Sequence, residues 1–350
     1  MALPRRGACA RTAAFLLAMA SCSAVRAQQT ALDFFKGKTI TIVTSTGPGG
    51  GYDLNARLIA RFMPRYIPGI ASVVVQNMPG GGNLRAANYM FEVAPKDGTI
   101  IGVVENGIPL KQVLEPTNMR FDVSRFNWLG STGGHNEAIM ALSSSGVQSI
   151  DDLRNKEVVL GGTGASSTLV MYPAAMNNVL GTKFKIVTGY TSSTEIYLAM
   201  DRSEVVARSG TIASLYNWHS DWVALGKIKI LTQIGLRPDA TMPGIPLMMD
   251  LATKEDDKRV LGLISSPAAL GNPYYAPPGV PADRLALLST ALASTLKDPD
   301  FLKEAEKIQA EIAPMSGPDV ARIIDNVVGA SNAVVERARL AIEVKEGLSR

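Results

Sequence analysis

Thr44–Ala60 reads TSTGPGGGYDLNARLIA, and this stretch decides the fold. Its four glycines and one proline lie between a β-branched run, Lys38–Ser45, and a segment with apolar residues at helical spacing, Asp53–Arg65. β-Branched residues favour strands, and apolar residues that recur every three or four positions favour a helix. The stretch therefore predicts a strand, a glycine loop and a helix in succession.

The alternation of strands and helices continues along the chain. Strand, helix, strand in this order predicts a parallel sheet with crossover helices. Further strands are predicted at Ala71–Gln76, Thr99–Val104, Ala138–Leu142, Glu157–Leu160, Phe184–Thr188, Val205–Arg208, Ile228–Ile234 and Leu261–Ser266. Further helices are predicted at Gly82–Val93, Ser167–Leu180, Thr194–Arg202, Arg284–Leu296, Pro299–Ala310 and Pro318–Val344.

Two such units in one chain predict an α/β protein with two lobes, each a mainly parallel sheet flanked by helices. We expect the second unit to be inserted into the first, with crossings near Leu129–Thr132 and Gly262–Pro267. This assigns residues 28–130 and 264–350 to lobe 1 and residues 131–263 to lobe 2. The cleft between two lobes is a usual place for a ligand.

Residues 1–27 have the pattern of an export signal. Arginines at the start are followed by a short apolar stretch and by small residues around Ala27, where we expect cleavage. The alternative is a lipoprotein anchored at Cys22, because Met19–Cys22 loosely resembles a lipobox. Either route predicts an exported protein, which we place in a bacterial periplasm.

The leader also explains the cysteines and the net charge. Cys9 and Cys22, the two cysteines of the chain, both lie in it, so the cleaved chain has no disulfide and no thiolate metal site. The whole chain has 35 basic and 31 acidic residues, and the leader holds four arginines and no acid, which leaves 31 of each. We therefore expect no nucleic-acid partner. No later segment is apolar enough to span a membrane.

The glycine loop suits an anion. The first N–H groups of a helix lack partners within the helix, and the macrodipole places partial positive charge there. Glycines let a carboxylate or phosphate approach the backbone. Asp53 fits the role of N-cap residue of the following helix. The alternative is a tight turn that binds no ligand.

A second loop repeats this arrangement. Leu160–Thr168 reads LGGTGASST, again between a predicted strand and a predicted helix. Ser166, Ser167 and Thr168 supply hydroxyls that can either cap the helix or bind an anion. Both loops follow the carboxyl ends of strands, so we expect them to face each other across the cleft.

Enzyme motifs are not found at either loop. Tyr52 stands where the dinucleotide fingerprint needs glycine, and no P-loop, GxSxG or HExxH pattern is present. The two histidines, His135 and His219, are expected to be structural, and Trp218 and Trp222 beside His219 to be packing residues. The acidic pairs Asp151-Asp152 and Asp256-Asp257 are expected to cap helices or to be solvated in a charged loop, and no metal or cofactor is predicted.

Several short motifs in combination resemble one family, the periplasmic solute-binding proteins of tripartite tricarboxylate transporters, also called the Bug family. The family pattern has a Pro-Gly-Gly loop with a nearby Asp, an Ala-Arg helix, an Asn-x-Pro-Gly turn and a Pro-x-Asp-Gly segment. Here these are Pro48-Gly49-Gly50, Asp53, Ala56-Arg57, Asn77-Met78-Pro79-Gly80 and Pro95-Lys96-Asp97-Gly98-Thr99. Gly162–Ser166 resembles the second ligand loop, and the resemblance covers nearly all of the mature chain.

The resemblance implies a two-lobed Venus-flytrap fold of the periplasmic-binding-protein type and no enzymatic activity. It implies a small organic acid held by backbone N–H groups and bridging waters, and a membrane permease with a large and a small subunit as partner. We expect a monomer. The ligand-binding set that we predict is Pro48, Gly49, Gly50, Tyr52, Asp53, Asn106, Ser131, Gly164, Ala165, Ser166, Ser167, Thr168, Tyr190 and Ser209.

The chain departs from the family at two places. The family often has His-Leu after the second loop, where this chain has Leu169-Val170. It often has Pro-Tyr-Lys-Gly after the next strand, where this chain has Gly189-Tyr190-Thr191-Ser192 and so lacks the lysine. Loss of that cation favours a monocarboxylate or another solute of low charge.

Two other functions are compatible with the sequence. One is an exported α/β enzyme that uses His135 or Glu137 in the interlobe cleft. The other is a binding protein that reports a solute to a membrane signalling partner. The leading hypothesis is a receptor that delivers a carboxylate to a permease.

Overall fold

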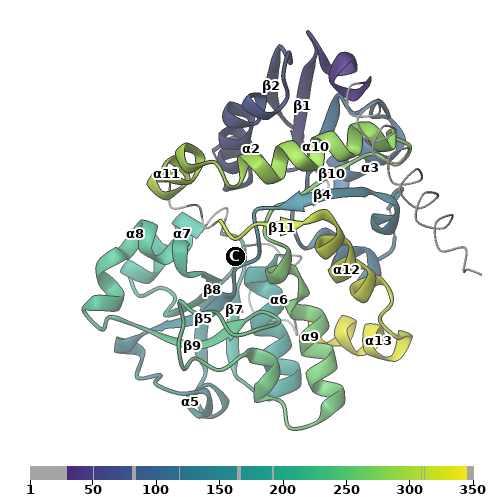
Figure 1. Ribbon diagram of the computed structural model, residues 1–350. Coiled ribbons are helices and arrows are strands. Elements are labelled where there is room, and N and C mark those ends of the chain that lie inside the picture. Colours follow the sequence, from purple (N-terminus) through teal and green to yellow (C-terminus); the bar gives the residue numbers. More distant parts are fainter. Residues whose placement is uncertain are drawn as a thin grey trace, which may run out of the picture.

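The computed structural model describes residues 30–344, with the exception of residues 50, 81–83, 118, 164–166, 191–192, 309 and 311. The side chain of residue 217 is also excepted. The predicted export signal, Gly50 and Gly164–Ser166 therefore lie outside the described residues. The chain forms two lobes, one above the other in Figure 1. No helix in the described part of the chain is long and apolar enough to cross a bilayer.

The first lobe is built on a six-stranded mixed sheet in the order β11-β4-β10-β3-β1-β2. β1 pairs in parallel with β2 and β3, while β10 and β11 run antiparallel to their neighbours. The strands are β1 (Thr39–Thr44), β2 (Ser72–Asn77), β3 (Ile100–Val103), β4 (Asn127–Ser131), β10 (Pro273–Ala276) and β11 (Met315–Ser316). The helices that follow individual strands of this sheet along the chain are α2 (Gly51–Phe62), α3 (Leu84–Glu92), α4 (Ile108–Leu114), α10 (Ala282–Thr295), α11 (Pro299–Lys307) and α12 (Gly317–Val328).

The second lobe has a five-stranded sheet in the order β7-β6-β8-β5-β9. β6 pairs in parallel with β7 and β8, and β5 runs antiparallel to β8 and β9. The strands are β5 (Glu137–Leu142), β6 (Val158–Gly161), β7 (Phe184–Val187), β8 (Ala207–Thr211) and β9 (Ile228–Ile234). The helices are α5 (Ile150–Asn155), α6 (Thr168–Ala175, continued by a π-helical segment, Met176–Leu180), α7 (Ser193–Asp201), α8 (Ile212–Ala224) and α9 (Glu255–Leu270).

Burial explains the strongest sequence signals. Ile40 and Ile42 on β1 and Ile59 on α2 are fully buried in one apolar cluster of the first lobe. A strand covered on both faces reads as a continuous apolar run, and a helix covered on one side reads as an apolar stripe. The continuous apolar run precedes the glycine loop in β1, and the apolar stripe follows it in α2. The strand–loop–helix prediction is therefore confirmed.

The strand predicted at Leu261–Ser266 is wrong, because these residues lie inside α9. This helix is buried on several sides, and its apolar run is therefore too continuous to show a helical period. The predicted crossing at Gly262–Pro267 lies in the same helix. The chain instead leaves α9 for β10 at Gly271–Asn272, and its first passage between the sheets is at residues 132–136.

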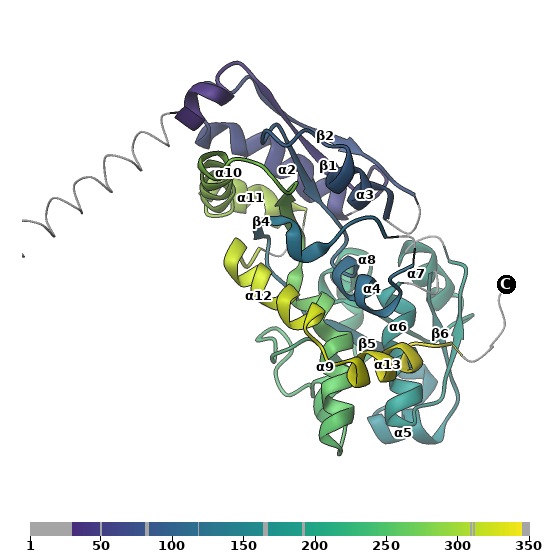
Figure 2. The ribbon, with the colours of Figure 1, turned by 90° about the vertical axis from the view of Figure 1, so that its right-hand side faces the viewer.

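The helix predicted at Pro318–Val344 is two helices, α12 and α13 (Asn332–Ala341), because Ser331 caps the second. α13 packs against α9 and α6 of the second lobe, as Figure 2 shows. The Asn178 side-chain amide donates to the Ala341 carbonyl at 2.8 Å, and Arg337 pairs with Asp257 on α9. The C-terminal segment therefore returns to the second lobe, and the assignment of all residues after 264 to lobe 1 stays a prediction.

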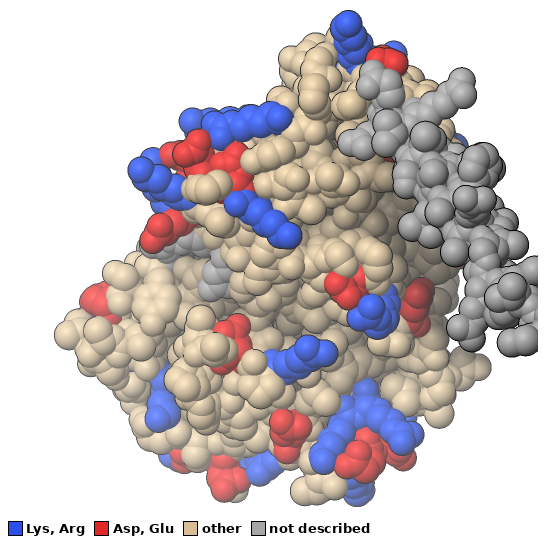
Figure 3. Space-filling model, viewed as in Figure 1, with Lys and Arg blue, Asp and Glu red and all other residues tan. Residues whose placement is uncertain are grey.

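Basic and acidic side chains alternate on the face of the molecule shown in Figure 3, without a large field of either sign. Several are close pairs, such as Arg339 with Glu336 at 3.0 Å. A mixed surface of this kind fits the even charge balance calculated for residues 28–350.

Candidate functional site

A cleft with a volume of about 840 Å³ lies between the two lobes. On the first lobe it is lined by the glycine loop at Pro48 and Gly49, by Tyr52 on α2 and by Asn106 after β3. On the second lobe it is lined by Glu137, Thr168, Ser193 and Thr211, at the ends of β5 and β8 and the starts of α6 and α7. The floor is formed by the two crossings at Thr132–Gly133 and Gly271–Asn272.

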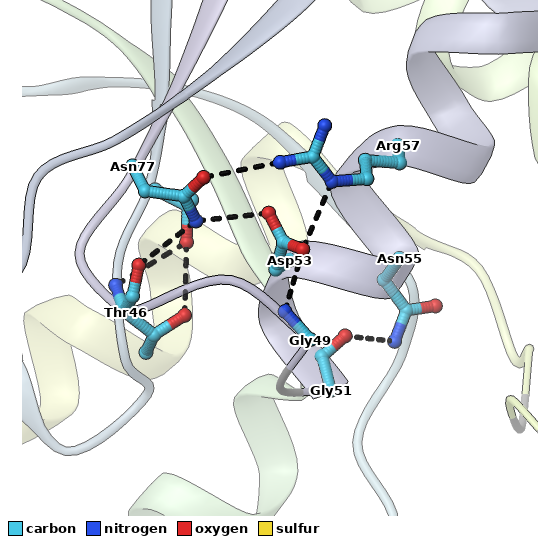
Figure 4. Close-up of polar contacts among 8 residues, drawn as sticks. Thr46, Gly49, Gly51, Asp53, Asn55, Arg57 and Asn77 are labelled. Carbon is cyan, nitrogen blue, oxygen red and sulfur yellow. Dashed lines mark hydrogen bonds and ion pairs between the residues drawn. The ribbon is translucent and has the colours of Figure 1, made fainter.

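Asp53 contacts the first loop through its side-chain carboxylate (Figure 4). Its carboxylate is 1% exposed and accepts hydrogen bonds from the Gly49 backbone N–H at 2.8 Å, the Asn77 amide at 2.8 Å and Arg57 Nε at 2.9 Å. Asn77 also donates to the Thr46 carbonyl at 3.0 Å. These contacts join the loop to the end of β2 and to the first turns of α2.

The predicted N-cap role of Asp53 is wrong, because α2 begins at Gly51 and Asp53 is its third residue. The carboxylate points back to the loop and does not line the cleft. Burial alone would raise the pKa of Asp53, but hydrogen bonds from Arg57, the Gly49 backbone and Asn77 outweigh it and hold the pKa below its usual value. Asp53 is therefore ionised and holds the loop whose residues Pro48 and Gly49 line the cleft.

Gly49 has a positive φ of 81°, a conformation that favours glycine. Its carbonyl side leads directly into α2, and Gly51 and Tyr52 at the start of that helix line the cleft. The start of α2 therefore lies at the cleft wall, and the use of its N–H groups by an anion stays a prediction.

The second loop opens α6 on the opposite wall. Ser167 caps α6, because its hydroxyl accepts from the Leu169 N–H at 3.2 Å, and it does not line the cleft. Thr168 does line it, and its hydroxyl donates to Glu137 Oε2 at 3.5 Å. Of the two roles considered for the serine hydroxyls, capping is the one that the structure gives to Ser167.

Tyr52 and Asn106 connect the first lobe to the floor of the cleft. The Tyr52 hydroxyl accepts from the Asn106 backbone N–H at 2.8 Å and donates to the Gly271 carbonyl at 3.5 Å. The Asn106 side chain donates to the Pro267 carbonyl at 2.8 Å. Burial raises the pKa of the Tyr52 hydroxyl, which therefore stays protonated.

Three predicted site residues are placed away from the cleft surface. Ser131 is fully buried at the first crossing, where its hydroxyl donates to the Leu270 carbonyl and accepts from the Gly133 N–H. Tyr190 and Ser209 are buried within the second lobe. They support the walls, and ligand contact for these residues stays a prediction.

The sequence prediction missed Trp218 as a cleft residue. It was expected to pack in the interior with Trp222, which is buried, but Trp218 is 49% exposed and lines the cleft mouth. His219 between them has non-helical backbone angles, which kink α8 and turn the two indoles to different sides. The ring of His219 stacks on Trp222 at 3.8 Å, so its predicted structural role fits.

Two acidic side chains of the cleft were outside the predicted ligand-binding set, although Glu137 had been considered there as a catalytic residue. Glu105 and Glu137 both line it, together with His135. Burial raises the pKa of Glu137 to about 7, although the Thr168 hydroxyl and Arg208 act in the opposite direction. Glu105 could have been found from its position, because it directly follows a predicted strand whose end faces the cleft.

Arg208 on β8 lies behind this wall. It is fully buried, its guanidinium carbon is 4.0 Å from the centroid of the Tyr197 ring, and its Nη2 donates to the cleft residue Ser193 at 3.2 Å. Nε donates to the Ser209 carbonyl, while Nη1 has no hydrogen-bond partner among the described residues. Among the described residues, no cluster of His, Cys, Asp and Glu side chains could hold a metal ion.

A model of the tripartite tricarboxylate transporter family receptor matches residues 56–340. The chain belongs to this receptor family. A curated relative, the "UPF0065 protein in gbd 5'region" of Cupriavidus necator, is 23% identical over 347 residues, which is 97% of each chain.

Solved structures agree with the family assignment. The chain resembles the periplasmic binding protein BugD with a TM-score of 0.65 and 18% identity, over 87% of this chain and 97% of BugD. It resembles R. palustris Rpa4515, solved with adipate, with a TM-score of 0.64 and 19% identity, over 86% of this chain and 97% of the other. These likenesses confirm the two-lobed binding-protein fold.

Family membership decides between the binding-protein class and the enzyme class that the sequence left open. The receptor is a solute-binding protein and not an enzyme. His135 and Glu137, considered above as catalytic groups, are therefore residues of a binding cleft.

Proposed function

We propose that this receptor captures a small organic carboxylate between its lobes in the periplasm and delivers it to a membrane permease with a large and a small subunit. The observation that carries the proposal is the placement of two helix N-termini, those of α2 and α6, on opposite walls of one cleft. Each presents the partial positive charge of a helix start to the cleft.

The first loop supplies the better-defined half of the anion site. Gly49 and Gly51 line the cleft beside Pro48 and have no side chains that would shield the backbone, and Asp53 accepts a hydrogen bond from the Gly49 N–H on the side away from the cleft. A carboxylate can therefore accept from N–H groups of the loop and the first turn of α2. Rpa4515, which has the same fold, was solved with adipate, and a carboxylate ligand for this receptor extends that finding.

A thermal-shift screen of organic acids tests the carboxylate proposal. A solute that binds only the folded receptor raises its melting temperature by mass action. We expect at least one carboxylate to do so, with one-to-one saturable binding in calorimetry. A screen of mono-, di- and tricarboxylates without any saturable binding would contradict the proposal.

A matched pair of variants locates the site. Gly49→Ala and Gly181→Ala both place a Cβ at a positive φ (81° and 73°) with open space around it. Both should lower stability by a similar amount, because the conformational strain is similar. Gly49→Ala should also weaken carboxylate binding, since only Gly49 lines the cleft. Equal affinity in the two variants would argue against the first loop as the site.

Export and cleavage near Ala27 are part of the same proposal. The mass of the receptor recovered from the periplasm distinguishes a chain that begins after Ala27 from one that begins with a lipid-modified Cys22. Co-purification with both permease subunits from membranes supplied with the ligand tests the delivery step.

A further inference from the structure

A second cavity lies outside the cleft between the lobes. It has a volume of about 420 Å³ and shares no described lining residue with that cleft. Its walls are residues 259–266 of α9, residues 323–334 from α12 to the start of α13, and Leu236 after β9, and we refer to it as the α9 pocket. α12 and α13 both pack against α9, and the three helices lie side by side in Figures 1 and 2. The volume is within the range of small-molecule sites.

The interior of the α9 pocket is apolar. Leu263 and Val327 are buried, whereas Leu236 is 37% exposed. An apolar ligand that covered these side chains would remove hydrocarbon surface from water, which favours binding. The aliphatic side chains that line the pocket come from the segment after β9, from all three helices and from the turn between α12 and α13: Leu236, Leu263, Ile323, Val327, Ala330 and Val334.

Space for such a ligand is left on α9 at Gly262. The α9 residues of the pocket recur at spacings of three and four residues, so they share one face of the helix: Arg259, Gly262, Leu263 and Ser266. Glycine is unfavourable in the interior of a helix. A Cβ at Gly262 would have only Met249 Cε within 4 Å, at 3.7 Å. A larger side chain would therefore fit here and would fill part of the pocket.

The α9 pocket carries one positive charge and no negative one among its described lining residues. The charge is that of Arg259. Its nearest acidic neighbours in the sequence, Asp256 and Asp257, both pair with Arg337 on α13. Arg259 itself forms no hydrogen bond and no ion pair with any described residue. Its guanidinium group is therefore available to an anion.

We propose that the α9 pocket is a second ligand site of the receptor, which takes an amphipathic monocarboxylate such as a medium-chain fatty acid. The hydrocarbon part of the ligand lies against the aliphatic side chains, and its carboxylate pairs with Arg259. The side-chain amide of Asn326, which also lines the pocket, supplies a further donor. The inference goes beyond the proposed function, because it does not depend on which solute the cleft holds.

A single accessible cation beside an apolar interior selects against other classes of ligand. A dicarboxylate would bring a second charge onto hydrocarbon walls, where it would lose hydration without gaining a partner. A cationic amphiphile would meet the like charge of Arg259. An uncharged amphiphile would bury the same hydrocarbon surface but form no charge-assisted hydrogen bond.

Titration calorimetry with three probes of equal chain length tests this ligand class. Octanoate, 1-octanol and octylamine share a hydrocarbon chain and differ in the polar group. At pH 7 we expect saturable binding of octanoate by the receptor, about threefold to tenfold weaker binding of 1-octanol, and still weaker binding of octylamine. Binding of 1-octanol as tight as that of octanoate would show that the carboxylate is not recognised and would overturn the inference.

Two variants and a control locate the octanoate. Gly262→Leu should weaken its binding about tenfold or more, because the new side chain occupies part of the pocket. Arg259→Gln should weaken octanoate about threefold to tenfold and leave 1-octanol unchanged, which a general disturbance of the structure would not do. The control, Arg322→Gln on α12, removes a side chain that is 71% exposed, pairs with Asp319 and does not line the pocket, and both affinities should stay unchanged.

Octanoate is itself a carboxylate, so the experiment has to separate the α9 pocket from the cleft. Gly49→Ala, which alters the cleft, should leave octanoate binding at the α9 pocket unchanged. Octanoate binding that is weakened by Gly49→Ala and kept by Gly262→Leu and Arg259→Gln would place the ligand in the cleft and overturn the inference, while the proposed function would stand. Absence of saturable octanoate binding would overturn it as well. If the Gly262→Leu variant does not fold, the effect of Arg259→Gln on octanoate but not on 1-octanol decides the question.

Discussion

At the scale of single residues, Asp53 shows how a buried charge can support the wall of a cleft that it does not itself line. Three donors converge on its carboxylate, and one of them is the backbone of the glycine loop. This carboxylate holds the Gly49 backbone at the cleft wall without a ligand, and such preorganisation lowers the entropic cost of binding.

Asp53→Ala should destabilise the receptor by about 1–3 kcal/mol, because the Asn77 and Gly49 donors of these partly buried hydrogen bonds lose their acceptor. Urea unfolding followed by circular dichroism measures the change. Asp151→Ala, which removes an exposed carboxylate paired with Arg154, is the control and should have little effect. A midpoint for Asp53→Ala equal to that of the control would show that the network does not stabilise the fold.

Glu137 should make the ligand-free receptor less stable as the pH rises. Its pKa is about 7 in the folded state and 4.5 as a free side chain, so between these pH values only the folded state binds the proton. The unfolding free energy therefore falls from pH 4.5 to 7, by roughly 3 kcal/mol in total, and stays at that lower level above pH 7.

Unfolding of the receptor and of its Glu137→Gln variant at pH 5 and pH 8 checks this linkage. The variant should gain stability relative to the unmodified receptor between the two pH values, while Glu115→Gln should not. A constant difference across this range would mean that Glu137 is already ionised in the folded state.

The roles of these two residues differ in how far the sequence could predict them. Asp53 was singled out because it lies within a short recognisable motif, although its partner proved to be the loop and not the helix. Glu137 gave no local signal for binding. Its environment depends on Arg208, Thr168 and Glu105, which come from three separate elements that only the folded chain brings together.

At the scale of elements, α6 presents its N-terminus to the cleft. Ser167 and Thr168 are neighbours in the sequence with different surroundings: one caps the helix and the other lines the cleft. Ser167→Ala should lower stability by about 1 kcal/mol through the lost cap and leave the dissociation constant unchanged.

Thr168→Val should weaken ligand binding and leave stability nearly unchanged. The isosteric change removes a hydroxyl from the cleft wall and keeps the Ser167 cap. Calorimetry well below the melting temperatures of both variants separates stability from affinity. Weaker ligand binding by Ser167→Ala with normal binding by Thr168→Val would reverse these assignments.

Helices and strands were predicted correctly where the apolar residues recur with a regular spacing along the sequence. The prediction failed where burial on several sides makes the apolar run continuous. β1 and α2 were recognised because their apolar residues show strand and helix spacing. α9 was mistaken for a strand because its middle is buried on several sides. β10 was missed because Pro273–Ala276 is short and lies in a proline- and glycine-rich stretch, although all four residues are buried in the sheet.

At the scale of the whole molecule, the two lobes should close on the ligand. Contacts from α2 on one wall and α6 on the other favour the closed form, and Gly271 at the second crossing has backbone angles that suit only glycine. Small-angle scattering should show a smaller radius of gyration when the probe with the largest thermal shift is added. An unchanged radius at saturation would contradict closure.

The return of the C-terminal segment to the second lobe has a mechanical consequence. Two neighbouring chain crossings alone would let one lobe both swing and twist relative to the other. The third connection runs from Ala313, whose N–H donates to the Thr132 carbonyl at 2.7 Å, through α12 to α13 on the outer side of α9. A third connection that lies away from the two crossings resists twisting of one lobe relative to the other, and it still permits a hinge rotation that opens the cleft. We therefore expect the lobes to open mainly along one angular coordinate, so that the distance between the two lobe tips alone would report whether the cleft is open or closed.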